Sequence, residues 1–164
     1  MSAYITLASP MTDQDCLLQA LAELGFDTSK VEIHEQAVQL EGYEGRQRKQ
    51  LANVIIRRRY VGSASNDIGF ELTSTGYRAH VSDFDQGRFG AQWMAELTTR
   101  YHTHHQAKMA RLAEVERRRK EEERRRLVEA QRQSIHKKAK AMGYRVQETR
   151  QGDKLRLVLV KRVY

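Results

Sequence analysis

The stretch Met109-Ala-Arg-Leu-Ala-Glu-Val-Glu-Arg-Arg-Arg-Lys-Glu-Glu-Glu-Arg-Arg-Arg-Leu-Val-Glu-Ala130 decides how this chain is organised. From His102 to Lys140 the sequence contains 13 of the 29 Lys and Arg residues but only 6 of the 21 acidic residues, so this region carries +7 and the rest of the chain +1. Between Gly90 and Gly143 there is no Gly or Pro, and helix is the only regular structure that these residues favour. The sequence therefore predicts a long basic helix attached to a small domain.

Four acidic residues along this helix precede a basic residue by one turn: Glu114 and Arg118, Glu116 and Lys120, Glu121 and Arg125, Glu122 and Arg126. Each such pair stabilises an exposed helix by roughly 0.2 to 0.5 kcal/mol. A long coiled coil is disfavoured, because 116–126 contains no apolar residue. One helix over 91–142 would extend about 78 Å. A break near Arg119 into a helical hairpin is the alternative, although no turn-forming residue marks it.

Three roles remain open for the charged helix. It could be a solvated spacer, or its two more apolar ends, around Leu112 and Leu127, could contact a protein. It could also bind nucleic-acid phosphates, although the interleaved glutamates weaken this hypothesis. The side chains that would make partner or nucleic-acid contacts are Arg117, Arg118, Arg119, Lys120, Arg124, Arg125 and Arg126.

Length and composition limit the rest of the protein. The chain has 164 residues, so about 125 lie outside the charged segment, which suits one domain. A single cysteine, Cys16, excludes an internal disulfide framework. There is no apolar run of about 18 residues and no secretion leader, so we expect a cytoplasmic protein without a membrane segment.

The remaining residues alternate between helical and strand periodicity. A short strand at 4–8 precedes a helix that Thr12 or Asp13 can cap and Gly25 ends. Strands are then expected near 31–33, 38–40, 53–61, 68–73 and 77–81, which form an antiparallel meander. A second helix begins near Trp93 and runs into the charged segment, and a hairpin follows over 144–149 and 155–163, with a last strand apolar enough to be central.

These elements predict an α+β fold with one small domain. It combines a largely antiparallel sheet with two helices, the second of which is extended into the long charged helix. The expected domain comprises 1–101 together with 143–164, and 102–142 form the helical extension.

Few residues suggest catalytic or metal chemistry. His102 and His105 are spaced to share a metal, but no nearby ligand completes the set, so no metal or cofactor is predicted. Asp67, Asp83 and Asp85 could converge on a cation, although turns ordinarily use aspartate for local hydrogen bonds. These positions therefore predict no catalytic site.

Two further features have plain structural explanations. Cys16 lies in the apolar stripe of the first helix and is expected in the core. Gly42-Tyr-Glu-Gly lacks the spacing and the Lys-Ser/Thr ending of a phosphate-binding loop, so the protein is not itself an ATPase of that type. We expect a positive-φ turn there, with Tyr43 packed on the sheet.

Short motifs in a fixed order resemble the hypothetical chloroplast reading frame thirty-five family, an uncharacterised group from plastids, cyanobacteria and other bacteria. They are Leu21-Ala-Glu-Leu-Gly, Gly42-Tyr-Glu-Gly with Gln47, Asn66-Asp-Ile-Gly-Phe, Tyr77 with Asp83, Arg100-Tyr with His104, Gly143-Tyr-x-Val, and Leu155-Arg-Leu-Val-Leu with Arg162. The resemblance implies a compact α+β domain without an established activity, and some bacterial relatives look as if they are encoded beside AAA-type ATPases.

Two departures from that family concern the start of the chain and the charged helix. Ala3 and Tyr4 stand where the family usually has His and Phe, so any role of that histidine is absent. The family also crosses from the equivalent of Tyr101 to that of Gly143 in about four helical turns, whereas 41 residues intervene here.

The sequence thus predicts a non-enzymatic accessory or adaptor protein. It would dock to a protein partner in a larger assembly, with an AAA-type ATPase as one such partner. The alternative is a nucleic-acid-binding protein that uses the Arg- and Lys-rich helix.

Overall fold

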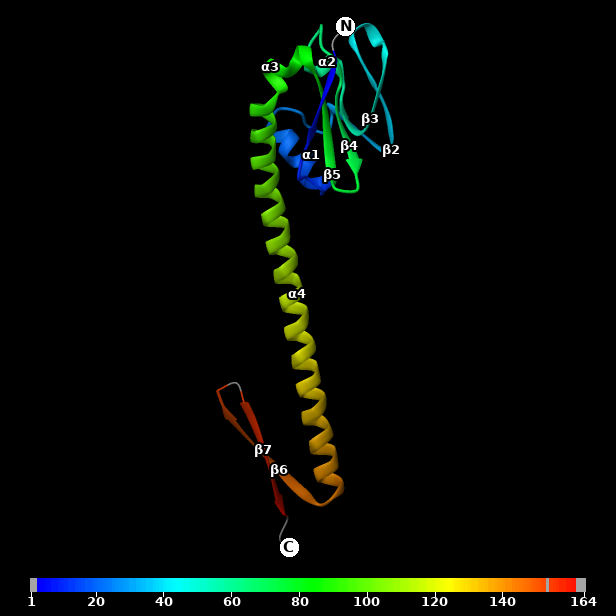
Figure 1. Ribbon diagram of the computed structural model, residues 1–164. Coiled ribbons are helices and arrows are strands. Elements are labelled where there is room, and N and C mark those ends of the chain that lie inside the picture. The colour runs from blue at the N-terminus through cyan, green and yellow to red at the C-terminus, as the bar shows by residue number, and fades with distance from the viewer. Residues whose placement is uncertain (1–2, 153, 162–164) are drawn as a thin grey trace. The chain divides into compact units, whose positions relative to one another are not determined.

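A five-stranded antiparallel sheet organises the first part of the chain in a computed structural model, which describes residues 3–152 and 154–161 (Figure 1). Its strand order is β1-β5-β4-β3-β2, so consecutive strands from β2 to β5 are neighbours and the expected meander is confirmed. β1 adds to the free side of β5 in the register Tyr4 with Ser82. The strands are β1 (Tyr4–Ala8), β2 (Val31–Glu41), β3 (Gln47–Ile56), β4 (Ile68–Thr73) and β5 (Gly76–Ser82).

Two helices cover one face of this sheet, α1 (Gln14–Glu23) and the beginning of α4 (Ala91–Ala141). Asp13 caps α1 by accepting a hydrogen bond from the Cys16 amide at 3.0 Å. Gly25 follows the end of α1 with a φ of +94°, a conformation that stops a helix, as expected. The apolar sides of both helices meet the sheet in the main core, which includes Leu17, Leu21, Val54, Phe70, Tyr77, Leu97 and Tyr101.

The opposite face of the sheet holds a smaller apolar cluster of Leu40, Ala52 and Ile55. Short helical turns connect the strands at one end: η1 (Tyr43–Gly45), α2 (Arg58–Val61), η2 (Asp83–Asp85) and α3 (Gln86–Phe89). The strand expected over 53–61 is therefore wrong beyond Ile56. The chain turns there because the carboxylate of Asp67 accepts a hydrogen bond from the Arg58 amide at 2.7 Å.

α4 continues without a break through Arg119 for 51 residues, so the single-helix alternative holds and the helical hairpin does not. After it, β6 (Tyr144–Gln151) and β7 (Lys154–Lys161) form a separate two-stranded sheet. The expectation that the last strand is central is wrong. Among the described residues β7 pairs with β6 alone, and all its residues except Leu157 are exposed.

The expected α+β class, with its antiparallel sheet and one helix extended into a long charged helix, is confirmed. The chain forms two compact units, Met1–Ala110, called unit 1 below, and Arg111–Tyr164, called unit 2. The boundary falls inside α4. The expected grouping of 143–164 with 1–101 as one domain stays a prediction.

Candidate partner-binding surface

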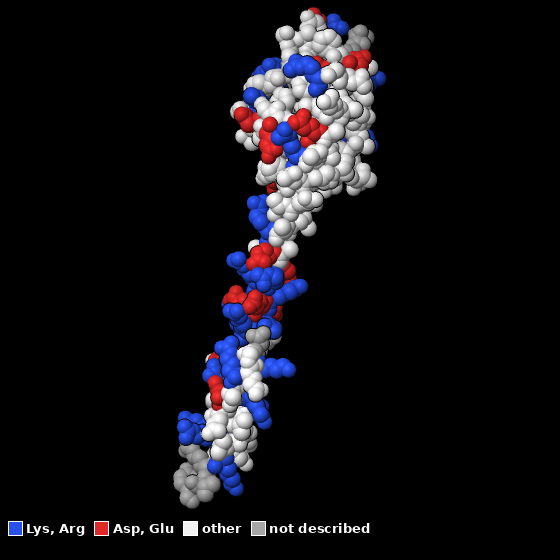
Figure 2. Space-filling view, turned by 90° about the vertical axis from the view of Figure 1, so that its left-hand side faces the viewer, with Lys and Arg blue, Asp and Glu red and all other residues white. Residues whose placement is uncertain are grey.

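The seven basic residues expected to contact a partner lie on the exposed surface of α4 in unit 2. Figure 2 shows basic and acidic side chains interleaved along this part of the helix. All four ion pairs expected one turn apart are present, with N–O distances of 2.5 to 3.6 Å. Arg117 and Arg119 pair with glutamates one turn before them as well. In the described part of the chain Arg124 alone of the seven has no such partner.

These ion pairs do not remove the cations from use by a partner. Six of the basic side chains remain 65% to 79% exposed. Water screens ion pairs at such exposure, and they contribute little to stability, so a partner's anion can replace a glutamate at little cost. Hydrogen bonds from the guanidinium groups of Arg117 and Arg118 lower the pKa of Glu114 to about 2, and Arg117 has the larger effect. This carboxylate is therefore charged at neutral pH.

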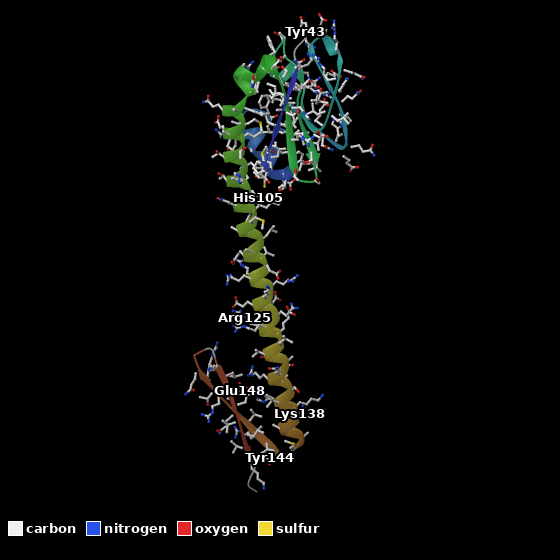
Figure 3. The ribbon with its side chains drawn as sticks, viewed as in Figure 1. Tyr43, His105, Arg125, Lys138, Tyr144 and Glu148 are labelled. Atoms are coloured by element: carbon white, nitrogen blue, oxygen red, sulfur yellow. The ribbon has the colours of Figure 1, made fainter. Side chains whose placement is uncertain are left out.

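The hairpin is attached to α4 through Glu148 on β6 (Figure 3). Both carboxylate oxygens of Glu148 accept hydrogen bonds from Arg132, each at 2.7 Å, and His136 contacts the same group. The Arg132 guanidinium, together with His136, holds the pKa of Glu148 at about 2. Arg132 also pairs with Glu129 on α4. A charged clamp, rather than apolar packing, is therefore the main link between β6 and α4.

Unit 2 lacks a buried core of its own. Among its described residues only Ala139 is buried, at 1% exposure. Apolar side chains on both the helix and the hairpin stay at least 38% exposed: Leu127, Val128, Ile135, Met142, Leu155, Val158, Leu159 and Val160. Burying an aliphatic side chain of this size stabilises a fold by roughly 1.5 to 3 kcal/mol, and unit 2 leaves that stabilisation unused. Its surface is suited to completion by another molecule.

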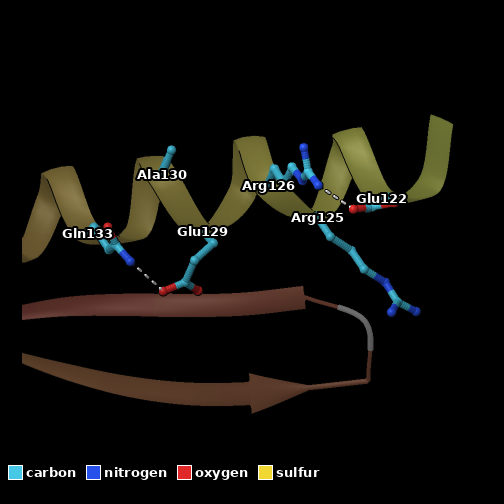
Figure 4. Close-up of a pocket in the computed structure, with 6 residues that line it drawn as sticks. All are labelled: Glu122, Arg125, Arg126, Glu129, Ala130 and Gln133. Carbon is cyan, nitrogen blue, oxygen red and sulfur yellow. Dashed lines mark hydrogen bonds and ion pairs between the residues drawn. The ribbon is translucent and has the colours of Figure 1, made fainter. Parts of the chain in front are cut away.

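Pockets follow α4 within unit 2. Figure 4 shows one of them, lined by Glu122, Arg125, Arg126, Glu129, Ala130 and Gln133. Polar side chains that line it bond to each other. Arg126 donates to Glu122 at 2.5 Å, and Gln133 donates to Glu129 at 3.2 Å. Another pocket lies between α4 and the hairpin. It is lined by basic, acidic and apolar side chains: Arg124, Arg125, Arg132, Arg150, Glu121, Glu129, Glu148, Val128 and Leu155.

In unit 1 the chemistry-bearing residues are mainly engaged with each other. Asp67 is fully buried, and its carboxylate accepts hydrogen bonds from the Glu41 amide, the Arg58 amide and the Arg57 guanidinium at 2.7 to 2.9 Å. Arg57 also pairs with Glu32 at 2.6 Å, and this hydrogen bond above all raises its pKa. Sequence reasoning missed this network, because Arg57 was expected to continue a strand.

The three aspartates considered as a cation site do not converge on one point. Asp85 accepts hydrogen bonds from Ser65 at 2.5 Å and from Ser82 at 2.8 Å, while Asp83 accepts one from the Phe84 amide. Asp83 and Asp85 accept hydrogen bonds within their own turn, as expected. Asp67 and Asp85 also join segments that are far apart in sequence. Among the described residues no group of three His, Cys, Asp or Glu side chains could hold a metal ion.

Two of the histidines of α4 in unit 1 share a neighbour. The rings of His102 and His105 both contact the ring of Tyr101, with 5.7 and 5.6 Å between centroids. His104 instead contacts Glu23 at 2.8 Å. Cys16 is buried in the core, as expected, and burial raises the pKa of its thiol. The expectation for Tyr43 is wrong: it is 48% exposed and lies beneath the guanidinium of Arg58 instead of packing on the sheet.

The expected positive-φ turn in the Gly42-Tyr-Glu-Gly loop is confirmed. The positive φ angles occur at Glu44 and Gly45, at 61° and 74°. Gly42 lies against the guanidinium of Arg48, which would have to move to make room for a Cβ there. The Tyr43 amide and Arg48 both donate to the Asn66 side chain, at 2.9 and 3.3 Å. Two motifs far apart in sequence therefore meet at this end of the sheet.

His80 is a buried histidine that sequence reasoning did not single out. Its Nδ1 lies 3.2 Å from the Thr6 hydroxyl, and its Nε2 lies 3.0 Å from Glu71. The order hydroxyl, imidazole, carboxylate is that of a nucleophile triad. Thr6 is the cross-strand partner of His80, however, and Glu71 lies two residues beyond its partner on the other neighbouring strand. The contacts satisfy the polar atoms of a histidine that is only 4% exposed. Only pairing of the strands could have revealed them.

Together, the fold and the exposed surface of unit 2 define a small α+β protein with a cationic, incompletely packed helix and hairpin. The chain belongs to the family described as "Protein of unknown function (DUF1257)", whose model matches residues 20–128. The match begins in α1 and ends within α4. No curated protein and no solved structure matches the chain. Across the residues that the structure describes, no helix combines the length and the apolar character needed to span a membrane.

Proposed function

We propose that this chain is a non-enzymatic accessory or adaptor protein of the cytoplasm that contacts a partner in a larger assembly through unit 2. The observation that carries this proposal is the missing core of unit 2, where Ala139 is the only buried residue among those described. An isolated two-stranded hairpin is marginally stable in water, and a third strand or a covering surface stabilises it. A partner that covers the apolar side chains of α4 and the hairpin would supply that stabilisation.

The distribution of charge supports an acidic partner. Residues 111–164 contain 18 Lys and Arg residues against 8 acidic residues, a net charge of +10, whereas residues 1–110 contain 11 against 13, a net charge of −2. An excess of one sign attracts surfaces of the opposite sign and raises association rates. Unit 1, whose polar groups are largely engaged internally, would serve as the folded body that presents unit 2.

The finer family assignment belongs to the same proposal. Within the family of unknown function, we propose that the chain groups with the hypothetical chloroplast reading frame thirty-five proteins, on the motifs around Gly42, Asn66 and Gly143. The contact between the loop of Tyr43 and Asn66 supports a shared role of two of these motifs in folding. An AAA-type ATPase is then one candidate for the partner.

Nucleic-acid binding is the second candidate function. The exposure of the seven basic residues from Arg117 to Arg126 favours it, and Arg124, with no ion pair to the described residues, is the cation most open to a phosphate. The glutamates paired with the other six oppose it, because they would repel the phosphate backbone. The exposed leucines and valines of the hairpin would also remain uncovered on a nucleic acid.

Affinity capture with the full chain in its native host, followed by nuclease treatment, tests the proposal. We expect a protein to stay bound after the nucleic acid is removed. Loss of all captured material on nuclease treatment would favour the second function. In that case the dissociation constant for a nucleic acid should be submicromolar at about 150 mM salt. The logarithm of the binding constant should fall linearly with the logarithm of the salt concentration, with a slope near −0.7 to −0.9 per phosphate contacted.

A set of glutamine variants separates the two surfaces. Replacing Arg117, Arg118, Arg119, Arg124, Arg125 and Arg126 by Gln should abolish nucleic-acid binding if the helix contacts phosphates. The comparison set replaces five hairpin cations by Gln, one fewer than the helix set: Arg145, Arg150, Lys154, Arg156 and Lys161. If the adaptor proposal is correct, the hairpin set should weaken capture of the protein partner more than the helix set does.

A further inference from the structure

We infer that the outer edge of β7 receives an acidic, extended segment of a partner protein as a third strand of the β6–β7 sheet. This inference deepens the proposed function and rests on it. β7 is paired with β6 in unbroken register from Tyr144 with Lys161 to Gln151 with Lys154. On its other side no strand pairs with it among the described residues. The N–H and C=O groups directed to that side form a template for another extended chain.

The side chains of β7 make this edge apolar on both faces. Glu148 faces α4, since it contacts Arg132, and its cross-strand partner is Leu157. Side chains alternate along a strand, so Leu155 and Leu159 share the α4 face with Leu157, whereas Val158 and Val160 lie on the other face. Leu159 is 47% exposed and Val158 is 39% exposed. A third strand would cover apolar surface on both faces at once.

The charges around β7 select an acidic occupant. Lys154, Arg156 and Lys161 are exposed cations on the strand itself, and Arg150 stands opposite Leu155. The one acidic residue that β6 and β7 contain, Glu148, is already held by Arg132 and His136. Opposite charges on neighbouring strands stabilise a sheet and like charges destabilise it. The occupant is therefore expected to alternate Glu or Asp with β-branched apolar residues.

The same charges disfavour a second copy of this chain. Two β7 strands joined edge to edge would place cations of both copies along one seam, with no acidic residue on either strand to offset them. Nucleic acid offers phosphates but neither the alternating backbone donors and acceptors nor the apolar side chains that the edge requires. A protein strand of negative charge satisfies all three demands.

A short peptide of alternating Glu and Val, added to the full chain, tests the inference. We expect it to bind and to slow amide hydrogen exchange along β7. The same peptide with every backbone nitrogen methylated keeps its charge and its side chains but cannot donate ladder hydrogen bonds. It should bind at least about tenfold more weakly. Equal binding of the methylated peptide would show attraction by charge alone and would overturn the inference.

Charge reversal on the protein provides the matched control. The double substitution Lys154→Glu and Arg156→Glu should lower the affinity for the Glu–Val peptide by about tenfold or more. It should also allow a Lys–Val peptide to bind. Lys49→Glu with Arg59→Glu changes the net charge equally but lies on exposed positions of unit 1, outside the candidate surface, and it should leave most of the affinity. Equal losses of peptide affinity in both variants would overturn the inference. A free chain that is already dimeric, with the β7 amides protected from hydrogen exchange, would overturn it as well. Unchanged circular dichroism in both variants shows that the fold is retained.

The capture experiment, repeated with Lys154→Glu and Arg156→Glu, separates the inference from the proposed function. If this variant captures the partner equally well, the adaptor function stands, but the inference that the partner adds a strand to β7 is wrong. Failure to capture any protein, with peptide binding intact, would remove the adaptor function and leave the edge as a binding site.

Discussion

The ammonium group of Lys108 lies 2.6 Å from the carboxylate of Asp13, although 95 residues separate them. Asp13 is the cap of α1, and Lys108 belongs to the last part of α4 inside unit 1. The same ammonium reaches Asp15 at 3.2 Å. One ion pair thus ties the start of the first helix to the long helix, and the hydrogen bond from Lys108 lowers the pKa of Asp13 to about 2.

Replacing Asp13 separates its cap from its ion pair. Asp13→Ala should lower the free energy of unfolding by about 1 to 2 kcal/mol, since it removes the cap. Asp13→Asn keeps a capping oxygen and should cost less than about 1 kcal/mol. Urea unfolding of both variants measures the difference. Equal losses would show that the ion pair, and not the cap, is the larger contribution.

Acid should weaken this contact in a defined direction. The folded-state pKa of Asp13, about 2, lies below the value of about 4 for an unfolded aspartate. The stabilisation is therefore fully present above about pH 4 and is lost as the pH falls toward 2. Lys108→Met should reduce this acid sensitivity, which thermal unfolding across that range can follow. An unchanged pH profile in Lys108→Met would contradict the assignment.

The hydroxyl of Tyr101 accepts hydrogen bonds from the amides of Thr12 and Asp13, both at 3.0 Å. Tyr101→Phe should leave both donors without this acceptor and destabilise the protein by about 1 to 3 kcal/mol. Tyr77→Phe is the matched control, because that buried hydroxyl donates a single hydrogen bond to Gln14 at 3.2 Å. Denaturant unfolding should rank Tyr101→Phe as the more destabilising change.

The buried carboxylate of Asp67 should be the most sensitive polar position in unit 1. Asp67→Ala leaves the Arg57 guanidinium and two amides without their acceptor, and we expect a loss of about 3 to 5 kcal/mol. Glu32→Gln removes the more exposed partner of Arg57 and should cost about 1 kcal/mol or less. Thermal unfolding compares the two. A mild effect of Asp67→Ala would mean that water can replace the carboxylate.

A peptide spanning 114–130 should be helical by itself at low salt. Its ion pairs are exposed, so about 1 M salt should screen them and remove part of the helicity. Circular dichroism measures both states. A control peptide with Glu114, Glu121 and Glu122 changed to Gln should lose most of the salt dependence. A random coil at low salt would contradict this prediction.

Glu148 should hold the hairpin against α4 within unit 2. Glu148→Gln weakens the clamp to Arg132 and His136, so the β6 and β7 amides should exchange faster with solvent. Because the pKa of Glu148 is held at about 2, below its unfolded value of about 4, acid should release the hairpin as the pH falls between these values. Glu129→Gln, which removes only the second partner of Arg132, should leave exchange nearly unchanged.

The sequence by itself determined the features that depend on neighbours one turn or one hairpin apart. The helical conformation on both sides of Arg119 and its glutamate–arginine pairs follow from a periodicity of 3.6 residues, whereas the structure decided that the helix does not break there. The hairpin of β4 and β5 follows from a Gly-containing turn between alternating strands. In these cases the interacting groups are fixed by local geometry, whatever the rest of the chain does.

Only the tertiary structure decided which distant groups meet. Periodicity shows that Asp67, Arg57 and His80 lie near particular faces or turns, but not that Arg57 reaches Asp67 or that His80 lies between Thr6 and Glu71. The apolar run from Leu157 to Val160 in β7 is compatible both with a central strand and with an exposed edge. Its place depends on whether another strand lies beside it, and that is a contact between segments far apart in sequence or in different molecules.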